Sequence, residues 1–255
     1  MCCLIQVDHL TYGVCYIVNS QIITNFGKRA DTYDNYSLLQ TDVAQRLFAL
    51  ADSEMPFSVL DIGCGTGRLS LMSSRKWPDA KTTALDASER MLSIVQNRNP
   101  IIRTIKCDAK EICLKERFDL IFSSMMLHWI ERPVEAAIAW RKLLNPGGRL
   151  LIAVPVFGSL LEWRELCLLA KVSDRVWVFP QENFLDDFCQ ERYIRDHKMV
   201  SDDLFSFLKW LKLTGAHASN PASHPISPAV MRRLCEQNNV EFVTTFRISY
   251  IIITP

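Results

Sequence analysis

Apolar positions between residues 55 and 156 follow two alternating patterns. Short continuous apolar runs are typical of strands buried on both faces, whereas an apolar residue every three or four positions is typical of an amphipathic helix. The continuous runs predict five strands, at 58–62, 82–86, 101–108, 118–124 and 149–156. The periodic segments predict helices at 68–77, 88–98 and 133–144, after a first helix at 41–51 that Thr41 or Asp42 would cap. Because strands and helices alternate regularly, we expect a parallel sheet with helices on both faces.

The pattern changes after Val156, where helical periodicity dominates. Helices are predicted at 159–172, 182–190, 203–213 and 227–237, and a strand is compatible with the residues around 193–200. Residues 241–253 are rich in β-branched and aromatic residues, and we expect them to close the sheet. The chain therefore divides into four expected parts: an N-terminal extension at 1–24, an α/β core with its N-terminal cap segment at 25–156, a helical lid at 157–240 and closing strands at 241–255.

Charge and cysteine content narrow the class of protein. The 255 residues carry 29 Lys and Arg against 28 Asp and Glu, a formal net charge of +1, which argues against a nucleic-acid binder that relies on bulk positive charge. No apolar run approaches the roughly 20 residues that span a bilayer, and the first residues do not fit a signal peptide. Nine scattered cysteines without a CxxC pair indicate reduced thiols in the cytoplasm. Cys107 and Cys113 lie apart from other ligand types, so no metal site is expected.

Glycines gather where the first predicted strand ends. Gly63, Gly65 and Gly67 follow the strand at 58–62 and precede a predicted helix. Their close spacing lets the backbone pass near a ligand, because a Cβ there would collide with it. Asp61 lies at the end of the strand, where a carboxylate would repel a pyrophosphate and attract an ammonium group. The spacing therefore points away from a nicotinamide dinucleotide and toward a ligand with a cationic amino-acid group.

Two further acids end the next strands. Asp86 lies nineteen residues after Gly67, where a carboxylate can accept both hydroxyl groups of a ribose. Asp108 ends the third strand, where it could accept a hydrogen bond from an adenine amino group. A single acid in such a position often only caps the next helix. Three of them, together with the glycine loop, favour a nucleoside-containing ligand.

The same residues resemble the class I S-adenosylmethionine-dependent methyltransferases. VLDIGCGTG at 59–67 is close to their first motif, Asp86 matches their ribose-binding acid, and CDA at 107–109 matches their adenine-side acid. NPGG at 145–148 matches the turn before their fifth strand. The resemblance implies S-adenosylmethionine as cofactor and an α/β, Rossmann-like fold: a seven-stranded, mostly parallel sheet with helices on both faces and an α-helical lid insertion. The cofactor-binding residues that it implies are Asp61, Gly63, Cys64, Gly65, Gly67, Asp86, Ala87, Asp108, Ala109 and Ser123.

The flanking segments resemble one family within this class, the malonyl-acyl-carrier-protein O-methyltransferases of biotin synthesis. The similar segments are 25–47, 123–133, 157–163, 178–184 and 208–219, whereas residues 1–17 have no counterpart. The resemblance implies O-methylation of the free carboxyl group of a malonyl thioester on acyl carrier protein (or on coenzyme A), which would start pimeloyl synthesis. The chain departs from the family at Ser124, where an Asn is frequent, and at Trp177 and Lys209, near positions where an Arg is usual.

The chemistry of a carboxyl acceptor limits what the side chains must do. A carboxylate with a pKa of about 4 is ionised at neutral pH, so its methylation needs no general base. By resemblance, Tyr33 and His128 would shape the site around the transferred methyl group. The malonyl carboxylate would need a cation, and Arg175, Lys209 and Lys212 are the candidates.

Two other functions are compatible with the sequence. The first is a methyltransferase for another small acid or a quinone precursor, whose hydroxyl group would need a base. The second is a non-catalytic assembly factor with the same fold, which the intact glycine loop and acids disfavour.

Overall fold

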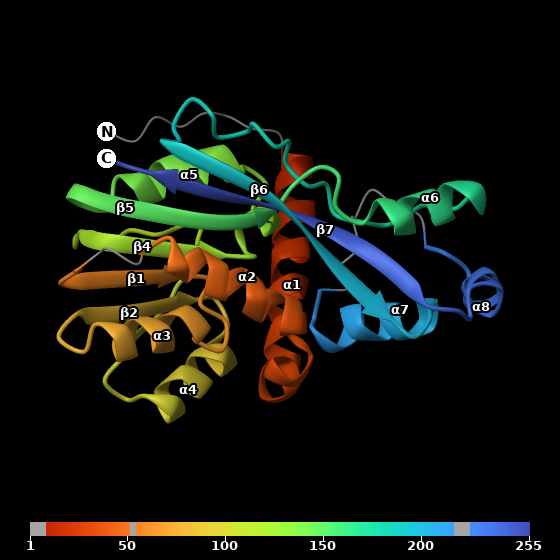
Figure 1. The fold of residues 1–255 in the computed structure, drawn as a ribbon, viewed down its shortest axis with the longest axis horizontal. Coiled ribbons are helices and arrows are strands. Elements are labelled where there is room, and N and C mark those ends of the chain that lie inside the picture. The colour runs from red at the N-terminus through yellow and green to blue at the C-terminus, as the bar shows by residue number, and fades with distance from the viewer. Residues whose placement is uncertain (1–8, 52–54, 217–224) are drawn as a thin grey trace.

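The computed structural model describes residues 9–51, 55–216 and 225–255 and places seven strands in one sheet (Figure 1). The strands are β1 (Ser58–Ile62), β2 (Lys81–Asp86), β3 (Arg103–Lys106), β4 (Phe118–Ser124), β5 (Leu144–Pro155), β6 (Glu191–Ser201) and β7 (Phe242–Ile253). Their order across the sheet is β3-β2-β1-β4-β5-β7-β6. β7 runs antiparallel to both neighbours, and β1 to β5 pair in parallel. The expected seven-stranded, mostly parallel sheet is confirmed.

Helices cover both faces of this sheet. They are α1 (His9–Tyr36), α2 (Leu38–Ala49), α3 (Arg68–Lys76), α4 (Glu89–Arg98), α5 (Pro133–Arg141), α6 (Leu161–Leu169), α7 (Leu204–Leu213) and α8 (Pro228–Gln237), with a short 3-10 helix, η1 (Leu127–Trp129). Side chains of successive residues in β1 point to opposite faces of the sheet, because side chains alternate along a strand. Val59 packs in the core that includes Val43 of α2, whereas Leu60 packs in the core that includes Trp140 of α5. The fully buried strand residues explain the continuous apolar runs of the sequence.

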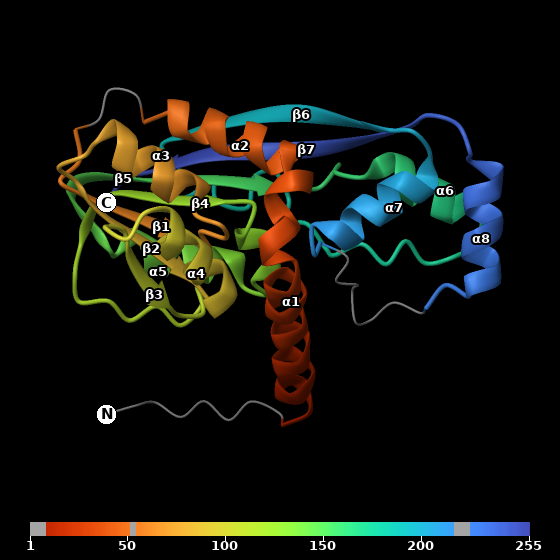
Figure 2. The same ribbon diagram turned by 90° about the horizontal axis from the view of Figure 1, so that it is seen from below.

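The longest helix, α1, lies between the parallel strands and the helices of the C-terminal half, whereas β6 and β7 extend past it toward those helices (Figure 1). It crosses the carboxyl ends of the parallel strands, with α6, α7 and α8 on its other side (Figure 2). The Trp210 indole Nε1 of α7 donates to the backbone oxygen of Tyr36 at 2.7 Å, which fastens α7 to the end of α1. Glu162 of α6 accepts a hydrogen bond from the Thr245 backbone N at 3.0 Å, which fastens α6 to β7. The lid helices are thus anchored at the edge of the sheet where the predicted site residues gather.

Several predicted boundaries are wrong. The segment 182–190 forms consecutive turns instead of a helix, and Arg192 Nη1 donates to the Glu182 carbonyl at 2.8 Å and to Asp186 at 2.6 Å. Helix α2 begins at Leu38 after Ser37, so neither Thr41 nor Asp42 caps it. Asp42 accepts a hydrogen bond from Arg46 and pairs with His197. NPGG lies inside β5 instead of ending the preceding helix.

The structure also bears on the expected parts of the chain. Helix α1 runs without a break across residues 24 and 25, where the extension was expected to end, and residues 1–8 lie outside the described part. The compatible strand around 193–200 is present as β6, the edge strand of the sheet, so the segment 157–240 is not wholly helical. Residues 217–219 of a family-like segment lie outside the described part. None of the helices within the described residues combines the length and the apolar character that crossing a membrane requires.

Candidate active site

The glycine loop joins β1 to α3 in three left-handed backbone steps. Gly63, Gly65 and Gly67 have φ angles of +70°, +54° and +84°, a region that side chains disfavour. A Cβ on Gly63 would lie 2.4 Å from Met126 Cγ, and one on Gly67 would lie 2.6 Å from Val95 Cγ2. A Cβ on Gly65 would meet nothing within 4 Å. Gly63 and Gly67 are therefore required by packing, whereas Gly65 borders open space.

Asp61 holds the first turn of α3 from the end of β1. Its Oδ2 accepts hydrogen bonds from the backbone N of Ser70 at 2.9 Å and from its Oγ at 2.6 Å. Burial raises the pKa of Asp61 to about 6, against the lowering effect of these bonds. A cationic group beside it would stabilise the ionised form, as expected for a partner of an ammonium group.

Asp86 links the end of β2 to the glycine loop. Its Oδ2 accepts from the Gly65 backbone N at 2.9 Å, and its Oδ1 accepts from the Ser88 backbone N at 2.8 Å. Burial raises the pKa of Asp86, opposed by these amide donors. Because each carboxylate oxygen has a second lone pair, Asp86 can still accept from two hydroxyl groups.

The predicted cofactor residues converge on one cavity of about 180 Å³, which we call the glycine-loop cavity. Eight of the ten predicted residues line it: Asp61, Gly63, Cys64, Gly65, Asp86, Ala87, Asp108 and Ala109. Gly67 and Ser123 do not line it. Gly67 precedes the first residue of α3, and Ser123 is only 1% exposed within β4.

A second cavity of about 260 Å³ lies on the lid side, and we call it the aromatic cavity. Its aromatic side chains come from distant parts of the chain: Phe26, Tyr33, Trp129, Trp163, Trp177, Phe179, Trp210 and Phe246. Five residues line both cavities and form what we call the shared wall: Phe26, Tyr33, Gln40, Met125 and Trp129. The two cavities are therefore neighbours, with residues of α1 and α2 between them.

Strained backbone is concentrated at the aromatic cavity. The described part of the chain has four residues other than glycine with positive φ, and Met125, Leu160 and Arg175 are three of them. All three line the aromatic cavity, with φ angles of 55° to 60°. Such strain persists where the surrounding structure enforces it, and it is frequent at binding sites.

His128 and Tyr33, the two predicted site-shaping residues, both line the aromatic cavity. Burial lowers the pKa of His128 to about 3, so its imidazole is neutral at physiological pH. Its Nδ1 is buried without a hydrogen-bond partner among the described residues. Burial raises the pKa of Tyr33 well above its ordinary value, which keeps the phenol protonated.

Comparison with known proteins gives the family. A methyltransferase domain family matches residues 59–148 of this chain. The malonyl-acyl-carrier-protein O-methyltransferase of Xylella fastidiosa (strain M23) is 32% identical over 206 residues, which cover 75% of this chain and 70% of that protein. The chain belongs to the malonyl-acyl-carrier-protein O-methyltransferase family. A second family member, from Ilyobacter polytropus, is 29% identical over 233 residues, which cover 86% of this chain and 88% of that protein.

A solved structure agrees on the fold. The plantazolicin methyltransferase BpumL, in complex with a triazolic desmethylPZN analogue and S-adenosylhomocysteine, superposes with a TM-score of 0.52 at 16% identity over 95% of this chain and 99% of that chain. The methyl donor of the malonyl-acyl-carrier-protein O-methyltransferases is S-adenosylmethionine, and the glycine-loop cavity fits it. An acid stands at the end of each of two adjacent strands, and Gly65 leaves open space for a ligand between them.

The candidate cations for a family substrate lie in different places. Arg175 lines the aromatic cavity, and its Nε is buried without a hydrogen-bond partner among the described residues. Lys209 and Lys212 are exposed on α7 and line neither cavity. Trp177, which stands near a position where the family usually has an Arg, contributes its ring to the aromatic cavity. The structure therefore places Arg175 at the candidate site and separates the two lysines from it.

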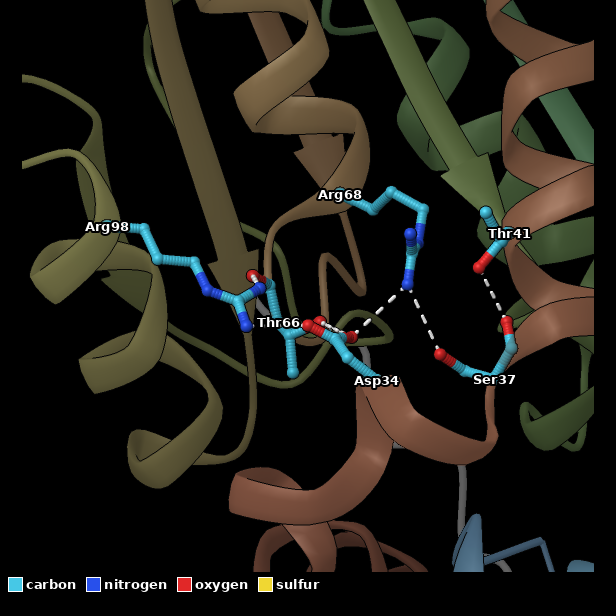
Figure 3. A network of polar contacts seen from close by, with 6 residues as sticks. All are labelled: Asp34, Ser37, Thr41, Thr66, Arg68 and Arg98. Carbon is cyan, nitrogen blue, oxygen red and sulfur yellow. Dashed lines mark hydrogen bonds and ion pairs between the residues drawn. The ribbon is translucent and has the colours of Figure 1, made fainter.

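The sequence did not predict two features of this site, the contacts of Asp34 and the position of Gln40. Asp34 of α1 pairs with Arg68 at 3.3 Å and with Arg98 at 2.6 Å, and these contacts fasten α1 over the glycine loop (Figure 3). Gln40 of α2 belongs to the shared wall. No sequence motif signals either role, because both depend on where α1 and α2 cross the sheet.

Proposed function

We propose that this chain transfers the methyl group of S-adenosylmethionine to the free carboxyl group of a malonyl thioester on acyl carrier protein. The product would be the methyl ester that starts pimeloyl synthesis for biotin. The relatives from Xylella and Ilyobacter carry the name of this activity. The two neighbouring cavities with a shared wall provide room for a methyl donor on one side and an acyl acceptor on the other.

The observation that carries the proposal is the set of titratable groups in the aromatic cavity. Among the described lining residues these groups are Tyr33, His128, Asp174 and Arg175. His128 is a weak base because its pKa is lowered to about 3, and the raised pKa of Tyr33 keeps its proton in place. Asp174 is engaged by Arg164 at 3.6 Å and by the Val176 backbone N at 3.0 Å. This cavity suits an acceptor that is already ionised, as a carboxylate is, better than a hydroxyl group that must lose a proton.

The reaction requires positioning and no proton transfer. S-adenosylmethionine, when bound, supplies a methyl group on a sulfonium that accepts the electron pair of the broken bond. A carboxylate oxygen forms the new bond to the methyl carbon, and the products are the ester and S-adenosylhomocysteine. The roles that we assign are the amino-acid end for Asp61, the ribose hydroxyls for Asp86 and the adenine side for Asp108, all of which line the glycine-loop cavity.

The substrate would bring a negative charge and an acidic protein. Arg175 is the one Arg or Lys among the described residues that line the aromatic cavity, and it would draw the malonyl group into it. Lys209 and Lys212 lie exposed on α7, whose Leu208 and Leu211 line the same cavity. These lysines are therefore placed to contact the surface of acyl carrier protein outside the cavity.

We also propose that this activity belongs to the cytoplasm. The six cysteines whose side chains the structure describes are free thiols, which is compatible with a reducing compartment; they are Cys64, Cys107, Cys113, Cys167, Cys189 and Cys235.

Mass spectrometry of intact malonyl-acyl carrier protein tests the proposal. Incubation with the enzyme and S-adenosylmethionine should add one methyl group, and removal of either component should abolish the addition. Acetyl-acyl carrier protein is the matched control, because it has the same carrier and thioester but no free carboxyl group. A malonyl-acyl carrier protein that stays intact and unmodified would contradict the proposal and favour another small acid or a quinone precursor as substrate.

A further inference from the structure

The shared wall marks where the methyl group must pass. Its members are Phe26, Tyr33, Gln40, Met125 and Trp129. A group transferred from one cavity to the other travels beside this wall, so the reacting carboxylate must lie against it. Arg175 lines the aromatic cavity alone and does not belong to the wall. Of the described residues that line either cavity, Gln40 alone has a side-chain amide.

The amide of Gln40 is held on a rigid support and lacks part of its hydrogen bonding. Gln40 lies in the first turn of α2, whose Val43, Ala44 and Leu47 are buried in the core. Its Oε1 is buried without a hydrogen-bond partner among the described residues. A buried, unpaired amide oxygen costs free energy that a ligand can recover. Rotation by half a turn about the last side-chain bond exchanges the oxygen and the NH₂ group, so the same position can present two donors.

The charge change of the reaction favours a neutral donor at this place. A carboxylate anion and a sulfonium cation become a neutral ester and a neutral thioether, so charge disappears as the transition state is reached. A cation on the attacking carboxylate would stabilise the ground state more than the transition state and slow the reaction. A neutral amide orients the carboxylate with less of this penalty. The aromatic lining has the same benefit, because it offers little solvation to the separated charges.

We propose that Gln40 orients the acceptor: its amide N–H donates to one oxygen of the substrate carboxylate and leaves the other oxygen aimed at the methyl group. The proposal rests on the proposed function and refines it. Arg175, which lies outside the shared wall, attracts the substrate anion into the aromatic cavity before the reaction, whereas Gln40 donates to the same carboxylate once it lies against the wall. The two residues should therefore affect different kinetic constants.

Two substitutions test this role against malonyl-acyl carrier protein, after the wild-type enzyme has been shown to methylate it. Gln40→Met keeps the size of the side chain and removes both donors, and it should lower kcat by about 10- to 100-fold. Gln40→Glu keeps the shape and places a second carboxylate beside the substrate. Gln45→Met and Gln45→Glu are the matched controls, because Gln45 is exposed on the same helix. Both controls should keep kcat within about twofold of the wild type.

The pH dependence of Gln40→Glu separates orientation from a structural role. A carboxyl group beside an anion in an apolar cavity has a raised pKa, and its protonated form has an O–H that can donate as the amide does. The kcat of Gln40→Glu relative to wild type should therefore rise severalfold from about pH 8 to about pH 6. The Gln45→Glu ratio should stay flat. Melting temperature and calorimetric S-adenosylmethionine affinity, expected within about threefold of wild type, establish that the variants are folded and bind cofactor.

The results that would contradict the role of Gln40 can be distinguished from a failure of the proposed function. If wild type leaves malonyl-acyl carrier protein unmodified, the proposed function fails, and the role of Gln40 falls with it. If wild type is active and Gln40→Met retains its kcat, only the role of Gln40 is overturned. If Gln40→Met loses S-adenosylmethionine affinity in proportion to activity, the amide serves the cofactor instead of the acceptor. A Gln40→Glu ratio that does not change with pH would also contradict donation to the carboxylate.

Discussion

The carboxylate of Asp34 in α1 accepts a hydrogen bond of 2.7 Å from the hydroxyl of Thr66 in the glycine loop. The two residues are 32 positions apart in the chain, and the contact joins the helix that crosses the sheet to the loop that lines the glycine-loop cavity. Arg68 also reaches Ser37 at 3.2 Å, so the contact belongs to a small network that closes around the loop (Figure 3). The position of α1 and the shape of the glycine loop are therefore coupled.

Asp34→Ala should weaken S-adenosylmethionine binding by about 1–2 kcal/mol, because the loop loses a charged acceptor and Arg68 and Arg98 lose their shared carboxylate. Calorimetric titration of the cofactor measures this change. Asp31→Ala is the control, since Asp31 is on the same helix and pairs with Arg90 in an exposed ion pair. Equal cofactor affinities of the two variants would show that Asp34 has no special effect on the loop.

Gly65→Ala should mainly reduce cofactor affinity, whereas Gly67→Ala should mainly reduce the stability of the fold. Both glycines have positive φ, which costs a side chain about 1 kcal/mol. Gly67→Ala would add a clash with Val95 and should lower the free energy of unfolding by about 2–4 kcal/mol in total. Gly65→Ala should lose only the roughly 1 kcal/mol of unfolding free energy that its positive φ costs, but it should bind S-adenosylmethionine about tenfold more weakly, because its methyl group enters the cavity. Urea unfolding measures the stability of both variants, and calorimetric titration measures their affinity for S-adenosylmethionine. A wild-type affinity of Gly65→Ala would show that the ligand does not occupy the open space beside Gly65.

Arg175→Ala should raise KM for malonyl-acyl carrier protein about tenfold with a smaller effect on kcat, since it removes a charge that binds the acyl group before reaction. Lys209→Ala should change KM by less than about threefold at physiological salt, because Lys209 is exposed on α7. Its effect should fade as salt rises, as expected of a contact at the rim. Steady-state kinetics at two salt concentrations measure both. A larger loss for Lys209→Ala than for Arg175→Ala would reverse the assignment.

His128 should make the fold sensitive to acid. Its pKa is about 3 in the folded chain against an ordinary 6.5, so the unfolded chain binds a proton more readily. The stability that comes from the neutral imidazole is complete above about pH 6.5 and falls as the pH drops toward 3. Between pH 7 and pH 5 the loss should be about 2 kcal/mol. Urea unfolding of wild type and His128→Gln at both pH values isolates the effect, and equal losses in the two proteins would contradict it.

The sequence predicted the central sheet well because its strands are buried on both faces. The predicted bounds of 58–62 and 118–124 coincide with β1 and β4. Asp61 and Asp86 were also placed at one cavity by sequence alone, since parallel strands end at the same edge of the sheet. Asp108 follows β3 by two residues and still reaches that cavity.

The elements around the sheet were harder to predict. Helix α1 was not predicted, because its position depends on contacts with residues distant in the chain, such as those of Asp34 with Arg68 and Arg98. The family-like segment predicted Lys209 as a candidate cation for the malonyl carboxylate. On α7, however, its neighbours Leu208 and Trp210 line the cavity and Lys209 faces outward. The helical spacing of the buried Leu204 and Phe207 favours an outward Lys209, and the prediction gave this local pattern less weight than the family resemblance.

The walls of the aromatic cavity come from two stretches of chain that lie on either side of the glycine-loop core. Phe26 to Gln40 contribute from before it, and Pro155 to Phe246 contribute from after it, apart from the segment Met125 to Trp129. A chimera that carries the lid of one relative on the rest of another would therefore build the aromatic cavity from two walls that do not match: the lid wall of one protein and the N-terminal wall of the other. Transplanting acceptor choice onto this core requires exchange of the N-terminal helices and the lid together.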